Sequence, residues 1–278
     1  MNRPLGISST MLGPDLTASE LSEAADRGIT HLEIFVRAES SLLEDKDEVL
    51  QVAERIAEAG MVPWSVHAPF GGEVDLSAPD ELKRRASVGT IRCACSVAEY
   101  LGARWVVAHA GIRGEDPEED ERRSCQSLRS INCLLAHMSL REIGLAIEYL
   151  PGSKPRLWNE SGEILETLEL LDGPPSVCLD TNHANLSEPL SDAVRALGAS
   201  IGTLHISDND GEQEMHQFPG EGVIDWPGFV DALDAVGYAG PLIYEARMEG
   251  NVSDHLEMTA STAREQLGWE PADARKGQ

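Results

Sequence analysis

The sequence predicts a single α/β domain that folds as a (β/α)8 barrel. Short apolar runs alternate with longer segments of helical periodicity about eight times, which favours parallel strands joined by crossover helices. The chain has 278 residues, close to the roughly 250 that such a barrel needs. No glycine-rich phosphate loop follows the first predicted strand, which argues against the alternative architecture, an open doubly wound sheet. These observations together predict a TIM barrel.

The predicted strands are short apolar runs that recur at intervals of about 25 to 40 residues. Eight is also the number of parallel strands that closes a TIM barrel. In chain order the predicted strands are Leu5 to Ser9, His31 to Phe35, Val62 to His67, Trp105 to His109, Gly144 to Glu148, Ser176 to Asp180, Gly202 to Ile206 and Pro241 to Glu245.

Helix-start signals lie between the predicted strands. Thr17-Ala18-Ser19-Glu20 has the pattern of a capping box, and the acidic run Glu115 to Glu121 is typical of a solvated first helical turn. No linker rich in proline, glycine or serine divides the chain. We therefore expect one barrel domain over residues 1–270 and a polar C-terminal tail over residues 271–278.

The charge of the chain limits its partners. It has 48 acidic and 22 basic residues, and its formal net charge is −26. Because nucleic-acid affinity rests largely on Lys and Arg displacing counterions, this balance argues against a nucleic-acid partner. No apolar stretch approaches the roughly 18 residues of a membrane span, and the N-terminal residues lack the pattern of a secretory signal. We expect a cytoplasmic enzyme that does not bind membranes.

Side chains that bind metals fall where the predicted strands end, and the strands of a barrel all end at one mouth. Five of the eight histidines lie at such ends or in the loops just after them, which random placement would not produce. Glu33 also lies on a predicted strand, and it faces the mouth only if strand alternation points it inward. The residues at the six strand ends are His67, His109, Glu148, Asp180, His205 and Glu245.

Three carboxylates of this set predict a metal site. Glu148, Asp180 and Glu245 are flanked by apolar strand residues, where a buried charge is costly unless a positive partner lies nearby. No lysine lies on these strands. We therefore expect one divalent metal ion, held by the three carboxylates and His205. The oxygen-rich set favours manganese, magnesium or cobalt, and zinc stays open.

The same segments resemble the xylose isomerase-like TIM-barrel superfamily, the sugar phosphate isomerase and epimerase group that also holds the AP-endonuclease branch. The resemblance spans nearly the whole chain, in order. It rests on His67-Ala68-Pro69, Ala146-Ile147-Glu148, Leu179-Asp180-Thr181-Asn182-His183, His205-Ile206-Ser207-Asp208, His216-Gln217-Phe218-Pro219-Gly220-Glu221-Gly222 and Tyr244-Glu245.

The resemblance to the ketose epimerases of this group implies a metal-dependent isomerase or epimerase of a sugar, a sugar phosphate or a keto-polyol. It implies the same ligands, Glu148, Asp180, His205 and Glu245. The two glutamates would form an acid/base pair that works through a metal-stabilised enediolate. His183 is implied to bind a substrate hydroxyl or carbonyl group. A homodimer is compatible with the family.

The remaining substrate contacts are expected around the same mouth. The epimerases carry an arginine shortly after the metal-binding histidine, where this chain has the acidic stretch 208–212, so Arg247 or Arg156 would have to replace it. Lys154, in the loop after the fifth strand, could bind a phosphate, a carboxylate or a keto oxygen. The predicted substrate-binding residues are His67, His109, His183, His216, Arg247 and Lys154.

Three other functions stay open. A dehydratase of a keto-inositol or a dehydroshikimate-like substrate would use the same metal site and release water. An AP-endonuclease-like phosphodiesterase is suggested by nearly all of that branch's three-zinc ligand set, in which Glu214 replaces an aspartate, although the acidic charge argues against it. The third alternative is a non-catalytic sugar binder, and the complete set of metal ligands argues against that role.

Overall fold

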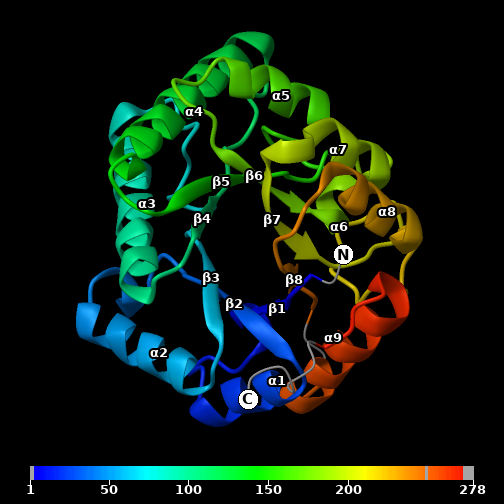
Figure 1. Cartoon of the computed structure of the whole chain (residues 1–278). Coiled ribbons are helices and arrows are strands. Elements are labelled where there is room, and N and C mark those ends of the chain that lie inside the picture. Colours follow the sequence, from blue (N-terminus) through cyan, green and yellow to red (C-terminus); the bar gives the residue numbers. More distant parts are fainter. Residues whose placement is uncertain (1–2, 248–249, 272–278) are drawn as a thin grey trace.

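Eight parallel strands form a closed barrel in the computed structural model, which describes residues 3–247 and 250–271. The strands are β1 (Leu5–Ser8), β2 (Ile29–Phe35), β3 (Val62–His67), β4 (Trp105–Ala108), β5 (Gly144–Glu148), β6 (Ser176–Asp180), β7 (Ile201–Ile206) and β8 (Leu242–Tyr244). They follow one another around the barrel in chain order, and β8 pairs with β1 to close it (Figure 1). The predicted TIM barrel is confirmed, and no predicted strand end differs from the observed one by more than two residues.

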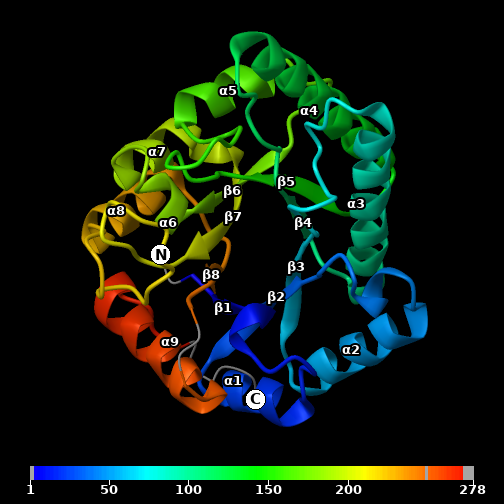
Figure 2. The same cartoon turned by 180° about the vertical axis from the view of Figure 1, so that it is seen from behind.

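The longer helices form a ring outside the strands, which Figures 1 and 2 show from opposite sides. Thr17 and Glu20 form the predicted capping box at the first helix, and Asp116 caps the helix that begins in the acidic run. None of the described helices combines the length and the apolar character that a membrane crossing requires. The helices are α1 (Ala18–Asp26), α2 (Lys46–Glu58), α3 (Glu81–Leu101), α4 (Pro117–Met138), α5 (Ser161–Glu169), α6 (Thr181–Ala184), α7 (Leu190–Leu197), α8 (Trp226–Val236) and α9 (Val252–Leu267), with short 3-10 turns η1 (Ser9–Met11), η2 (Ser41–Leu43) and η3 (Gly198–Ser200).

The predicted tail over residues 271–278 lies outside the described residues, apart from Pro271. The barrel is described up to that point, and it includes every candidate site residue named above.

Strand alternation separates an outer core from the barrel interior. On β5 the outward-facing Ile147 belongs to the large hydrophobic core between barrel and helices. The inward-facing Ala146 lies with Val107 and Cys178 in a small, separate buried cluster. Two residues further along β5, the same alternation turns Glu148 inward, where the strand ends.

A tryptophan fills the barrel below this small cluster. The ring of Trp105 packs so close to Gly144 that a Cβ atom there would lie 2.1 Å from it, and a Cβ atom at Gly202 would lie 3.0 Å from the same ring. Only glycine at these positions leaves room for the indole. The polar side chains at the strand ends therefore lie above an apolar layer formed by Trp105 and the small buried cluster.

The loop between β7 and α8 is organised by one buried carboxylate, that of Asp208. Its Oδ1 accepts hydrogen bonds from the backbone N–H groups of Asn209 and Ile224, and its Oδ2 accepts from the Gly220 N–H and the Trp226 indole. The side chain is fully buried. Four donors thus converge on one ionised group, which holds the loop that returns to the barrel mouth.

We expect the substitution Asp208→Asn to lower the free energy of unfolding by about 2 to 6 kcal/mol. The amide group would face two of the four buried donors with a donor of its own, and each unsatisfied buried donor costs about 1 to 3 kcal/mol. Urea denaturation of wild type and variant measures the difference.

The matched control for this substitution is Asp210→Asn, two residues along the same loop. Asp210 is exposed, and its Oδ1 accepts from the N–H groups of Glu212 and Gln213, which the Oδ1 of asparagine can also do. Its expected effect is within about 0.5 kcal/mol. Equal effects of the two substitutions would contradict the anchoring role of Asp208.

Candidate functional site

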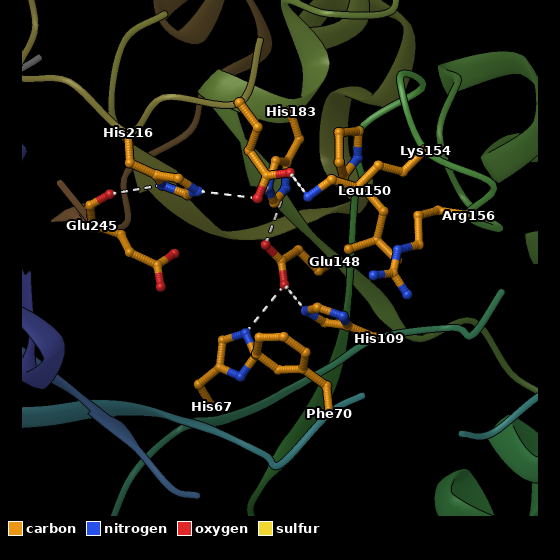
Figure 3. A pocket seen from close by; sticks show the side chains of 12 residues that line it. His67, Phe70, His109, Glu148, Leu150, Lys154, Arg156, His183, His216 and Glu245 are labelled. Carbon is orange, nitrogen blue, oxygen red and sulfur yellow. Dashed lines mark hydrogen bonds and ion pairs between the residues drawn. The ribbon is translucent and has the colours of Figure 1, made fainter. Parts of the chain in front are cut away.

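The candidate site lies at the carboxyl ends of the strands, where the sequence predicts it. His67, Glu148 and Asp180 are the last residues of β3, β5 and β6, and His205 is the penultimate residue of β7. His109 and Glu245 directly follow β4 and β8. The barrel therefore brings together side chains from six strand ends that are far apart in the sequence (Figure 3).

Four of these side chains form a compact group. Ligand atoms of Glu148, Asp180, His205 and Glu245 all lie within 4.8 Å of one another. His205 Nδ1 lies 3.0 Å from Glu245 Oε2, 3.4 Å from Glu148 Oε1 and 3.8 Å from Asp180 Oδ2. Three of the four side chains are at most 2% exposed, and Glu245 is 17% exposed.

The group fits a divalent cation, because it leaves buried polar atoms unsatisfied. Asp180 Oδ2 and His205 Nδ1 are fully buried, and neither atom has a hydrogen-bond partner among the described residues. The other oxygen of Asp180 accepts the N–H of His183 and caps α6, which leaves Oδ2 directed to the group. Buried carboxylates without a positive partner are costly, and three carboxylates with one imidazole are a familiar donor set for divalent metals.

Glu33 holds His205 from the opposite side. His205 Nε2 lies 3.1 Å from Glu33 Oε2, and the same oxygen accepts a hydrogen bond of 2.7 Å from the hydroxyl of Ser65. Glu33 is fully buried, so strand alternation does point it into the barrel. A carboxylate that accepts one ring N–H of histidine leaves the other nitrogen free for a metal. Glu33 is thus a positioning residue that the sequence left undecided.

Two further groups lie beside the first, and one of them shares Glu148 with it. His67 Nε2 and His109 Nε2 lie 3.1 Å and 2.7 Å from Glu148 Oε2. On the other side, His183 Nε2 and His216 Nε2 lie 3.6 Å and 3.5 Å from Glu214 Oε1. Each trio has the spacing that could hold a metal ion.

Three of these histidines are oriented in the same way. The Nδ1 atoms of His67, His183 and His216 lie 2.9 to 3.1 Å from the backbone carbonyls of Ala68, Tyr149 and Glu245. Because a carbonyl only accepts hydrogen bonds, Nδ1 carries the proton. In the neutral ring Nε2 then presents its lone pair to a carboxylate. Two acceptors that face each other require a proton or a cation between them.

The pKa directions agree with this geometry. Burial raises the pKa of Glu148, but the surrounding histidines outweigh burial and hold it well below its usual value. For Asp180 burial prevails, and its pKa is raised. Burial lowers the pKa of both His183 and His205. Asp180 and neighbouring carboxylates nevertheless raise the pKa of His183 well above its usual value, and Cys178 followed by Glu33 and Glu245 does the same for His205. The field of the buried carboxylates therefore favours positive charge inside the group.

The pocket over these groups contains most of the predicted substrate-binding residues. Lys154 reaches it from the β5–α5 loop, and its ammonium group pairs with Glu214. Arg247 does not line this pocket. It lines a neighbouring one beside Asp254 and Met258 of α9. The pocket is lined by His67, Phe70, His109, Glu148, Leu150, Pro151, Lys154, Arg156, His183, Glu214, His216 and Glu245 (Figure 3).

Arg247 departs from its predicted place because the chain leaves the barrel after Glu245. The backbone N–H of Arg247 donates to the carbonyl of His216 at 2.6 Å, which directs the chain toward α9. Glu214 lies in the pocket although the sequence analysis assigned it no substrate contact. The sequence pointed to Glu214 only through the resemblance to the three-zinc ligand set of the AP-endonuclease branch.

The sequence matches a known family over most of its length. Residues 21–269 match the family model described as xylose isomerase-like TIM barrel.

Some of the curated relatives carry names that indicate an activity. An L-ribulose 3-epimerase of Mesorhizobium japonicum is 29% identical over 80% of this chain and 74% of its own length. A D-psicose 3-epimerase of Enterocloster bolteae is 25% identical, over 78% and 72%. A protein named "Probable endonuclease 4" of Natronomonas pharaonis is 26% identical, over 64% and 67%.

Solved structures show the same fold. A D-tagatose 3-epimerase-like protein superposes with a TM-score of 0.81 at 21% identity, covering 96% of this chain and 98% of its own. An L-ribulose 3-epimerase superposes with a TM-score of 0.80 at 21% identity, covering 96% and 95%.

We expect Glu33→Gln to weaken the binding of Mn²⁺ or Co²⁺ by about 10- to 100-fold, the usual loss when a residue that orients a ligating histidine is changed. The variant should still fold without metal, because glutamine keeps an oxygen that can accept from the hydroxyl of Ser65 and from His205 Nε2. Titration of metal into the chelator-treated protein, followed by calorimetry, measures the affinity.

The control for this substitution is Glu39→Gln, which removes the same charge from an exposed residue beyond β2. Unchanged metal affinity in a folded Glu33→Gln variant would show that Glu33 does not position His205.

Proposed function

Because the chain belongs to the xylose isomerase-like TIM-barrel family, we propose that it is a divalent-metal-dependent isomerase or epimerase of a sugar, a sugar phosphate or a keto-polyol. The observation that carries the proposal is the placement of two glutamates, Glu148 and Glu245, in one group with Asp180 and His205. Two of the relatives are named as sugar 3-epimerases, which supports this reading of the group.

The carboxylates of Glu148 and Glu245 lie close enough together for one to remove a proton from a substrate carbon and the other to return one. Ligand atoms of Glu148 and Glu245 lie within 4.8 Å of each other, so both reach one substrate carbon. A divalent cation held by this group would supply stabilisation of the negative charge that develops on the substrate oxygens as a carbon-bound proton leaves. We expect manganese, magnesium or cobalt there, and zinc remains an alternative.

The proton balance of an epimerisation fixes the states of the pair. One glutamate begins as a carboxylate and takes the proton from one face of the substrate, while the other begins protonated and returns a proton to the opposite face. The two states are exchanged after each turnover. His67 and His109 both contact Glu148 Oε2 and favour its ionised state. Burial raises the pKa of Glu245, but His205 lowers it to about 2, so both glutamates are carboxylates before the substrate binds, and the second would have to gain its proton when the substrate enters.

The pocket walls would hold the substrate. His183 presents Nε2 without a hydrogen-bond partner among the described residues, and a substrate hydroxyl group could provide one. Phe70 offers an apolar face at the rim, where its ring stacks on His109 at a centroid distance of 3.9 Å. We propose that sugar hydroxyls contact the imidazoles while the carbon skeleton packs on Phe70.

The same residues would also serve a dehydratase. A glutamate would again take the carbon-bound proton. It would then give that proton to the hydroxyl group that leaves the neighbouring carbon, so that water is released and the glutamate returns to its ionised state. The two reactions differ in product mass, since epimerisation conserves it and dehydration lowers it by one water.

A second candidate function is metal-dependent phosphodiester hydrolysis. The observation that favours it is the presence of three adjoining groups that could each hold a metal, together with the relative named as an endonuclease. The net charge of −26 weighs against a nucleic-acid substrate, because phosphate backbones are repelled by such a surface. A non-catalytic sugar-binding role is less compatible with a complete set of metal donors.

We expect protein purified without chelator to contain about one equivalent of Mn, Co or Mg per chain by mass spectrometry, and Glu148→Gln to lose it. Glu212→Gln is the control, since Glu212 is exposed and lines no described pocket near the site. Two or three zinc ions per chain would favour the hydrolase, and absence of metal from both proteins would contradict the proposal.

Activity is expected as deuterium exchange from D2O at the carbon next to the carbonyl of a ketose, with L-ribulose and D-psicose as first candidates. Glu245→Gln should lower the turnover by about 100- to 10,000-fold, because one partner of the proton transfer is removed. NMR follows the exchange, and mass spectrometry separates epimerised from dehydrated product. Full exchange in the Glu245→Gln variant would contradict the acid/base role.

A further inference from the structure

We propose that the site includes an anion-binding subsite centred on Arg156, which recognises a phosphate or carboxylate group on the substrate, at the end away from the two catalytic glutamates. This inference rests on the proposed function, since it names the chemistry of the substrate for the same pocket. It starts from an arginine that forms no ion pair with any described carboxylate, in a chain of 48 acidic residues.

Arg156 is held in place by its backbone. Its segment forms an antiparallel bridge with Ile112, and Leu157 N–H donates to the carbonyl of Gly111 at 3.3 Å. The backbone N–H of Arg113 donates in turn to the carbonyl of Pro155 at 3.0 Å. The loop after β5 is therefore fastened to the loop after β4, and Arg156 is half-buried between them.

Two cavities meet at Arg156. The first lies over the metal-binding groups, and the second lies beyond Phe70, along the loops that follow β3 and β4. Arg156, Phe70 and His109 line both cavities. Figure 3 shows the guanidinium group of Arg156 extending into the first cavity near His109. A single substrate could thus contact the metal-binding groups and the guanidinium at once.

The second cavity is positively charged although the protein is strongly acidic. Its charged lining residues are three cations, Lys83, Arg123 and Arg156, and one acid, Asp75. The carboxylate of Asp75 is already satisfied, because it accepts from the hydroxyl and the backbone N–H of Ser77 and pairs with Arg123 at 3.1 Å. The lining therefore favours a negatively charged ligand.

Among these cations, Arg156 is the one that is free to bind a negatively charged ligand. Arg123 is engaged by Asp75 and Glu119. The ammonium group of Lys83 pairs with Glu73 at 3.6 Å and donates to the carbonyl of Gly72 at 3.1 Å. Lys154, the other cation of the first cavity, is neutralised by Glu214. A guanidinium group presents paired N–H donors that match a phosphate or a carboxylate, and charge-assisted hydrogen bonds of this kind are the strong ones.

The test is equilibrium binding of a matched series of ligands, measured by calorimetry on the metal-loaded protein. The series is D-fructose, its 6-phosphate and D-fructuronate, which differ only at the terminal carbon, with inorganic phosphate as a fourth probe. We expect one of the two anionic sugars to bind about 10- to 100-fold more tightly than D-fructose. The tighter anion identifies whether the subsite takes phosphate or carboxylate.

Arg156→Gln should abolish this preference, so that the anionic sugars bind the variant no more tightly than D-fructose does. Arg156→Lys, which keeps the charge and loses the paired geometry, should retain part of it. Arg122→Gln is the control, because Arg122 is exposed on α4 and its removal changes the net charge equally. Thermal unfolding establishes that each variant is folded.

Equal binding of the neutral and anionic sugars by wild type would overturn the inference, as would an equal loss for all ligands in Arg156→Gln. Failure of the two anionic sugars and of inorganic phosphate to bind would also overturn it. The titration needs no turnover, so an anion preference in a protein without activity on ketoses would contradict the proposed function alone.

Discussion

The barrel mouth is organised around the burial of four carboxylates beside one histidine. Glu33 and Glu245 approach the two ring nitrogens of His205 at 3.1 Å and 3.0 Å, and Glu148 and Asp180 complete the group. One imidazolium ion cannot neutralise four buried acids. The arrangement is therefore stable only with additional positive charge. This requirement explains both the raised pKa values of His183 and His205 and the expected affinity for a divalent cation.

The fold and most of the central group could be predicted from the sequence, because two simple rules place the side chains of Glu148, Asp180, His205 and Glu245. Alternation along a strand sends Glu148 to the same side as Ala146, and barrel closure brings all strand ends to one mouth. The four ligands of the central group follow from these rules. Glu33 stayed undecided because alternation divides the residues of β2 between two faces without saying which face points into the barrel.

Loop residues were harder to predict, because no periodicity constrains them. Glu214 reaches the pocket only through the fold of the 207–225 loop, which Asp208 anchors, and Arg247 lines the neighbouring pocket instead. The contact between the loops after β4 and β5, which places Arg156, is likewise invisible in the sequence. The proposed substrate contacts depend on such loops, whereas the proposed metal site depends on the strands.

Glu148 is shared between the central group and the trio with His67 and His109, so one scaffold offers sites for different numbers of cations. Crystals soaked in Mn²⁺ and measured for anomalous scattering test the central claim most directly. The account predicts one strong peak, about 2.0 to 2.3 Å from donor atoms of Glu148, Asp180, His205 and Glu245. A peak only at the flanking groups, or none at the barrel mouth, would contradict it.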